Sequence, residues 1–237
     1  MPNSYFKFKQ FTVNQELATM KVGTDGVLLG AWAPVGDNVR QILDIGTGTG
    51  IIALMLAQRS VAQIDAVDID EASVQQADEN FKRSPWSNRL AVHKSDFQAY
   101  GKACSAKYDL VVSNPPYFSR SLKSPELART LVRHTDMLPH NQLLEGVASV
   151  LSPHGCFCAV FPYTEGNVFV ALAATFGLFC NRRLNVYSVP GKPVIRVLLQ
   201  FSFTRGLVEE HDMYIHTKEG AYTDAYRALT KDFYLAF

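Results

Sequence analysis

Apolar residues along this chain gather in short runs that alternate with longer segments of helical character. The short runs predict buried strands at residues 42–45, 64–69, 89–97 and 108–112. A helix is predicted after each of the first two strands, at residues 51–57 and 72–83. This alternation indicates an α/β fold, with a mostly parallel sheet and helices on both faces.

The second half of the chain shows further elements. The pattern predicts a helix at residues 136–151, which Ser152, Pro153 and Gly155 should end. A strand at 156–161 and a helix at 164–176, with Gly177 as the residue after its end, should follow. Residues 178–189 and 194–203 are expected to form a final hairpin.

Three glycines follow the strand at residues 42–45, and the predicted helix follows them. Gly46, Gly48 and Gly50 are spaced by two, which differs from the wider spacing of dinucleotide-binding loops. Glycine allows a tight turn and a close ligand, and the helix start supplies unpaired N–H groups. Asp44 lies just before the loop and would repel a pyrophosphate but pair with an ammonium group. An ordinary glycine-rich turn is the alternative.

Two acidic residues after later strands are candidates for nucleoside recognition. Asp68 lies 18 residues after Gly50, close to the spacing at which an acid reaches ribose hydroxyls. Ile69 is grouped with it, whereas Asp70 is interpreted as a helix cap. Asp96 and Phe97 are expected to contact an adenine amine and ring, although Asp96 is equally well explained as a turn residue.

A polar pair precedes the glycine loop. Thr24 or Asp25 is expected to cap a helix that runs to Trp32. The pair would either close over the amino-acid end of a ligand or serve only as a cap.

The tract Asn114-Pro115-Pro116-Tyr117 ends the strand at residues 108–112. The prolines remove two N–H donors and leave carbonyls free. The Asn114 side-chain oxygen and the Pro115 carbonyl can hold both hydrogens of a planar amine and aim its lone pair. Tyr117 can stack on the flat substrate. The sequence therefore predicts an amino-group acceptor at this turn, where catalysis is mainly alignment.

Composition places limits on this interpretation. The chain has 237 residues, 47% hydrophobic and 19% charged, as expected of one globular domain. A net charge of +1 gives no global signal for nucleic acid, so any such site must be a local patch. No apolar run approaches the roughly 18 residues of a membrane span, and no signal-peptide core is visible.

The four cysteines, Cys104, Cys156, Cys158 and Cys180, lack the paired CxxC spacing of a zinc site. We therefore predict no metal and expect free thiols in a reducing cytoplasm.

Basic residues gather in two segments that suit a phosphate backbone. The first follows Tyr117 and contains Arg120, Lys123, Arg129, Arg133 and His134. The second, residues 181–206, has five basic residues and no acidic one, and its candidates are Arg182, Arg183 and Lys192. Residues 6–9 alternate aromatics with lysines and are interpreted as a hairpin at the domain edge, with nucleic-acid contact as the alternative.

The order of these motifs over about residues 20–205 resembles the S-adenosylmethionine (SAM) dependent amino-methyltransferases. The resemblance implies SAM as cofactor and a Rossmann-like sheet of seven strands, six parallel and one antiparallel, with the ligand at the strand ends. It further implies one domain, with an N-terminal extension and capping helix at 1–36, a SAM-binding core at 37–206 and a tail at 207–237 packed on the core.

Residues 20–33, Arg133-His134 and the tail are similar to those of bacterial methyltransferases that modify adenine N6 in tRNA. The likeness runs nearly end to end. It implies adenine 37 in the tRNA anticodon loop as the target and tRNA as the partner, unstacked into the pocket beside Tyr117. Guanine N2 in rRNA, a protein glutamine, or SAM binding alone remain alternatives.

Overall fold

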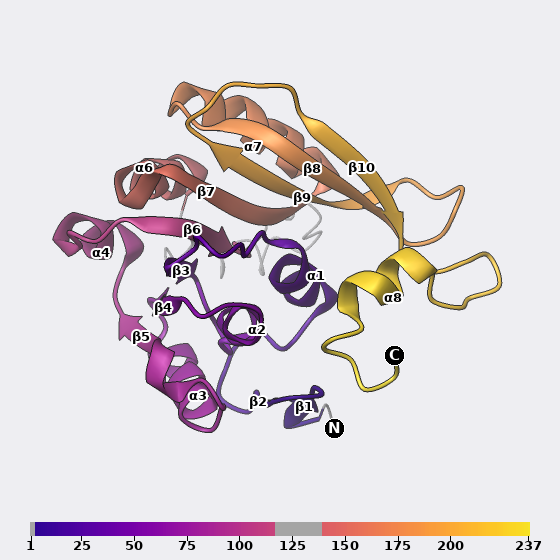
Figure 1. Cartoon of the computed structure of the whole chain (residues 1–237), viewed down its shortest axis with the longest axis horizontal. Coiled ribbons are helices and arrows are strands. Elements are labelled where there is room, and N and C mark those ends of the chain that lie inside the picture. Colours follow the sequence, from indigo (N-terminus) through magenta and orange to yellow (C-terminus); the bar gives the residue numbers. More distant parts are fainter. Residues whose placement is uncertain (1–2, 117–138) are drawn as a thin grey trace, which may run out of the picture.

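The computed structural model describes residues 3–116 and 139–237. An eight-stranded sheet crosses the molecule in the order β10-β8-β9-β7-β6-β3-β4-β5 (Figure 1). Its strands are β3 (Gln41–Ile45), β4 (Gln63–Asp68), β5 (Leu90–Lys94), β6 (Tyr108–Ser113), β7 (Leu151–Pro162), β8 (Phe179–Tyr187), β9 (Val194–Ser202) and β10 (Glu209–Tyr214). The helices are α1 (Thr24–Trp32), α2 (Ile51–Arg59), α3 (Glu71–Lys82), α4 (Phe97–Ala103), α6 (His140–Val150), α7 (Tyr163–Thr175), α8 (Asp224–Thr230) and the short 3₁₀ helix η1 (Ser87–Arg89).

The sheet is mostly parallel, as the sequence predicted. Neighbouring strands pair in parallel from β7 through β6, β3 and β4 to β5, and β10 is parallel to β8. Strand β9 runs antiparallel to both β7 and β8, which confirms the final hairpin. The expected count of seven strands is wrong because β10 adds an eighth. Its sequence, EEHDMY, is polar and mostly exposed, so no apolar alternation marks it.

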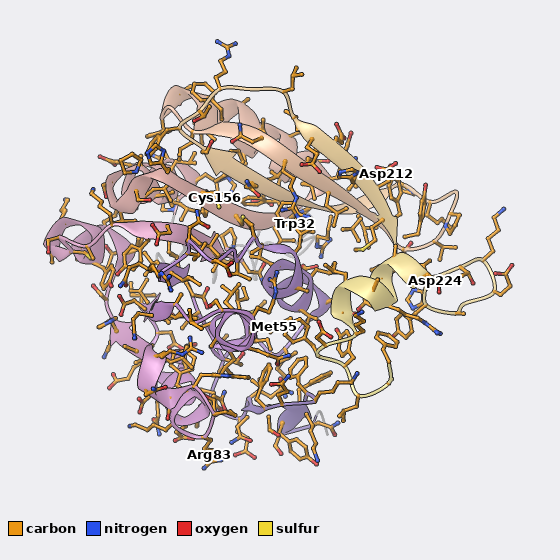
Figure 2. The ribbon with its side chains drawn as sticks, in the orientation of Figure 1. Trp32, Met55, Arg83, Cys156, Asp212 and Asp224 are labelled. Carbon is orange, nitrogen blue, oxygen red and sulfur yellow. The ribbon has the colours of Figure 1, made fainter. Side chains whose placement is uncertain are left out.

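Helices cover both faces of the sheet (Figure 1). One apolar cluster joins the sheet to α1, α2, α3 and α8, and a second joins it to α4, α6 and α7. Helices α1 and α2 pack closely because Gly30 has no side chain, since a Cβ there would lie 2.8 Å from the Met55 sulfur. Figure 2 labels Met55 on α2 and Trp32 at the end of α1.

The N-terminal residues form a separate hairpin, as expected. Strand β1 (Tyr5–Lys7) pairs antiparallel with β2 (Thr12–Asn14). The Lys9 N–H donates to the Phe233 carbonyl at 2.9 Å, and the Phe8 ring lies 6.0 Å from that of Tyr234. The two ends of the chain therefore pack against each other.

Two predicted boundaries are wrong. Gly23, not Thr24 or Asp25, is the N-cap of α1, and no side chain caps that helix. Strand β7 begins at Leu151, directly after α6, so Ser152, Pro153 and Gly155 lie within it. Gly155 marks a close approach and not a turn, since a Cβ there would lie 2.7 Å from the Tyr108 carbonyl oxygen.

Gly177 does follow the end of α7 with φ of 74°, as predicted. None of the helices within residues 3–116 and 139–237 is long and apolar enough to cross a membrane.

Candidate active site

The candidate residues lie where the strand order reverses. From β3 the chain continues to β4 and β5 on one side, whereas β6 returns to the other side of β3. Ligands of open α/β sheets bind at such a switch point, beyond the carboxyl ends of the strands. The Ser113 hydroxyl donates to the Ile45 carbonyl at 2.9 Å and joins the ends of β3 and β6. Sequence reasoning missed Ser113, which places Asn114 beside the start of the glycine loop.

The three loop glycines have backbones that favour glycine. Their φ angles are 69° at Gly46, 55° at Gly48 and 81° at Gly50. Nothing lies within 4 Å of a Cβ built at Gly46 or Gly48, whereas one at Gly50 would lie 2.6 Å from the Phe81 ring. Gly50 thus permits packing of α3, and the first two glycines border open space.

Hydrogen bonds fix this loop to the neighbouring strand. The Gly46 N–H donates to the Val67 carbonyl at 2.8 Å, and the Gly48 N–H donates to Asp68 Oδ2 at 2.8 Å. Asp68 Oδ1 accepts from the Asp70 N–H at 3.0 Å. The Asp68 carboxylate therefore holds the turn, and burial raises its pKa.

Asp44 is fully buried below the loop. Its Oδ2 accepts a 2.7 Å hydrogen bond from the Thr47 hydroxyl, and the backbone N–H of Ala53, at the start of α2, faces the carboxylate. Within residues 3–116 and 139–237, Oδ1 has no other polar partner. Burial is the main cause that raises the Asp44 pKa from 3.8 to about 7, and the nearby Asp68 adds to it. A cation at Oδ1 would relieve this cost, whereas an anion would increase it.

One of the residues after β4 has the role that the sequence predicted. Asp70 caps α3 by accepting from the Ser73 N–H at 3.0 Å, which confirms its assignment. Ile69, directly after Asp68, is 45% exposed, so it presents an apolar surface next to the loop.

Asp96 and Phe97 both take part in the fold. Asp96 is the N-cap of α4, where its Oδ1 accepts from the Ala99 N–H at 3.1 Å. The Phe97 ring is 4% exposed and packs where Gly146 of α6 leaves room for it. Their contact with an adenine stays a prediction.

The start of α1 lies beside the start of α2. Gly26 packs against Ile51, and a Cβ there would be 3.4 Å from that side chain. Asp25 Oδ2 accepts from Arg196 Nε at 2.8 Å, and Arg196 pairs with Pro162 at the carboxyl end of β7. Thr24 is exposed at the same helix start. Sequence reasoning missed this ion pair, which fixes the start of α1 at the carboxyl edge of the sheet.

The acceptor tract is described only in part. Asn114 is half-buried, Pro115 is buried and Pro116 is exposed. Outside the described residues lie Tyr117, Arg120, Lys123, Arg129, Arg133 and His134.

The second basic segment is partly engaged within the fold. The Arg182 guanidinium lies 4.1 Å from the centre of the Trp32 ring and donates to the Trp32 carbonyl. Arg183 donates to Asn185 and lies 3.4 Å from Glu210 of β10. Lys192 is exposed in the turn between β8 and β9. Strand β10 thus brings acidic residues to a segment that has none of its own.

Other parts of the described chain offer no competing centre. All four cysteines are free thiols, and no described cluster of histidine, cysteine or acidic residues suits a metal. Two surface hollows, of about 570 and 390 Å³, contain no residue of the glycine loop in their linings. The larger is lined by Tyr163, Asn185, Tyr187, Val194, Glu210, His211 and Asp212, and the smaller by Asn14, Glu16, Leu17, Gln75, Gln76, Glu79 and Arg83.

The glycine loop at the switch point, the buried Asp44, the half-buried Asp68 and the adjacent Asn-Pro-Pro segment fit a Rossmann-like methyltransferase. Residues 27–158 match the family model described as methyltransferase small domain, and the chain belongs to this family. A relative from Bacteroides fragilis is 48% identical over 99% of both chains, and one from Trichodesmium erythraeum is 45% identical over 100% of both. Both relatives are named tRNA1(Val) (adenine(37)-N6)-methyltransferase.

Solved structures share the fold at low identity. A predicted O-methyltransferase from Agrobacterium tumefaciens has a TM-score of 0.71 at 16% identity, with 88% of this chain and 96% of that chain covered. A glycopeptide N-methyltransferase complexed with SAM has a TM-score of 0.56 at 12% identity, with 78% of this chain and 100% of that chain covered.

Proposed function

We propose that this chain transfers a methyl group from SAM to N6 of adenine 37 in tRNA1(Val). The observation that carries the proposal is the hydrogen bond from Ser113 to Ile45, which puts the acceptor turn at Asn114 next to the glycine loop. Relatives of the same length and 43–48% identity with that name support the choice of substrate.

The loop residues fit SAM. Asp44 is a fully buried carboxylate whose ionisation burial makes costly, and the ammonium group of SAM would offset its charge. Gly46 and Gly48 border open space that a Cβ would fill. Asp68 would accept from ribose hydroxyls and Ile69 would pack on the adenine, with Asp96 and Phe97 at its amine and Thr24 and Asp25 near the amino-acid end.

The chain itself mainly binds and aligns. SAM supplies an electrophilic methyl group. The Asn114 side-chain oxygen and the Pro115 carbonyl accept the two hydrogens of the adenine amine, so the nitrogen lone pair points away from the ring plane. Tyr117 stacks on the base, a contact worth roughly 1–3 kcal/mol. No base need act before attack, because the amine loses its proton afterwards, and alignment supplies most of the acceleration.

We place the tRNA anticodon loop across the carboxyl edge of the sheet. Lys192 is exposed there, whereas the basic candidates after Tyr117 lie outside the described residues. Phosphate contacts by these residues would position the loop without reading its sequence. Because tRNA is the substrate, the cytoplasm is the expected compartment, and residues 37–206 are the expected SAM-binding core.

The test uses the full chain, labelled SAM and total tRNA from cells that lack this activity. We expect label in tRNA, and nucleoside mass spectrometry should find N6-methyladenosine at position 37 of tRNA1(Val). Label in protein, in rRNA or in another nucleoside would refute the proposal. An Asn114→Ala variant serves as the control for label that does not depend on the acceptor turn.

A further inference from the structure

Asn80, near the end of α3, connects two distant segments of the chain. Its side chain is 1% exposed. Its Nδ2 donates to the Asn14 carbonyl at 2.8 Å and to the Thr49 carbonyl at 2.9 Å, and its Oδ1 accepts from the Asn14 N–H at 2.9 Å. Both donor hydrogens of the amide are therefore used.

The two segments joined by Asn80 both border the candidate active site. Thr49 lies between Gly48 and Gly50 in the glycine loop. Asn14 is the last residue of β2 and the first of residues 14–22, here called the N-terminal strap, which lead to the start of α1. Gln76, one turn before Asn80 on α3, holds the strap alone by accepting from the Leu17 N–H at 3.0 Å.

The Thr49 carbonyl belongs to the last peptide before α2. The N–H of that same peptide, on the N-cap Gly50, donates to the Thr47 carbonyl at 2.9 Å, so the Asn80 bond and this bond together fix the peptide that leads into α2. Buried amide side chains that are fully hydrogen-bonded hold backbones in one arrangement, because each lost bond leaves a buried group unpaired. Asn80 thus restrains the loop with a polar contact, next to the apolar contact of Phe81 with Gly50.

We propose that Asn80 is a positioning residue for the cofactor: through Thr49 it holds the glycine loop in its SAM-binding shape and couples that loop to the N-terminal strap. This inference rests on the proposed function. Loss of the Asn80 amide should weaken SAM binding and leave the acceptor turn intact, because Asn114 is fixed by β6 and Ser113.

The experiment compares Asn80→Ala with Gln76→Ala in the full chain. Both side chains are 1% exposed on the same helix, and both hold the strap, but only Asn80 reaches the loop. For Asn80→Ala we expect the Kd and KM for SAM to rise about tenfold, the order expected from freeing one hydrogen bond. The kcat at saturating SAM and the KM for tRNA should stay within about twofold, since neither depends on this bond. Gln76→Ala should lower the melting temperature but leave the Kd for SAM within about twofold.

An unchanged Kd for Asn80→Ala, or an equal rise in both variants, overturns the inference. A wild-type chain that binds no SAM refutes the proposed function instead, so the two failures are distinguishable. Should Asn80→Ala fail to fold, hydrogen exchange of the wild-type chain decides. Added SAM should then slow exchange of the Asn14 amide more than that of the Leu17 amide, and equal slowing overturns the coupling.

Discussion

The ionised Asp44 carboxylate should lower the stability of the folded protein while it favours binding of SAM. Its pKa rises from 3.8 in an exposed setting to about 7 in the fold, mainly through burial. One pH unit corresponds to about 1.4 kcal/mol, so the ionised carboxylate costs the folded apo protein about 4 kcal/mol. An Asp44→Asn substitution removes this cost.

The direction of the pH effect on stability follows from the number of protons that the folded and unfolded chains bind. Between pH 3.8 and about 7 the folded chain holds a proton on Asp44 that the unfolded chain has lost, so this residue lowers stability as pH rises. The cost is fully present above pH 7 and absent below pH 3.8. The asparagine amide carries its own penalty of about 1–3 kcal/mol, because its NH₂ group would face a donor that now pairs with the carboxylate, but that penalty does not change with pH.

The difference in unfolding free energy between Asp44→Asn and wild type should therefore increase by about 3 kcal/mol from pH 5 to pH 8. At this chain length that increase corresponds to roughly 6–12 °C in the difference of melting temperatures. Thermal unfolding of both proteins without SAM at the two pH values measures it. Asp70→Asn, in an exposed helix cap, should show no such gain. Equal differences at pH 5 and pH 8 would refute the raised pKa.

Four further outcomes are expected. In calorimetric titrations, the Kd of wild type for SAM should fall about eightfold from pH 6 to pH 7.5, because the ionised fraction of Asp44 rises by that factor. The Asp44→Asn variant should bind SAM weakly at both pH values. Asn114→Ala should lower single-turnover methylation of tRNA about a hundredfold with the Kd for SAM unchanged, and lost SAM binding would show that the turn is misassigned. Asp68→Ala should weaken SAM binding about tenfold, and an unchanged Kd would exclude the ribose contact. Gly48→Ala should cost about 1–2 kcal/mol in urea unfolding because φ is 55°, and Gly23→Ala serves as the control with an ordinary φ.

Local patterns were sufficient to predict the central sheet and the glycine loop. Strands β3, β4 and β6 each contain a short apolar run, and the three glycines follow β3 directly in the sequence. Strand β10 was missed because its exposed, polar residues belong to the sheet only through pairing with β8. The Asp25–Arg196 ion pair joins residues 171 positions apart, and nothing local marks such a pair.

The glycine loop has the shape of an anion site but the charge of a cation site. The start of α2 and the open backbone at Gly46 and Gly48 would suit a phosphate on geometry alone. Asp44 and Asp68, however, lie directly below and beside that space, and Asp68 raises the cost of ionising Asp44. A pyrophosphate would add a third negative group, whereas the ammonium and sulfonium charges of SAM, the proposed cofactor, would offset the two carboxylates. Electrostatics therefore selects between ligands that the backbone alone would accept, and neutralising Asp44 should reduce that discrimination.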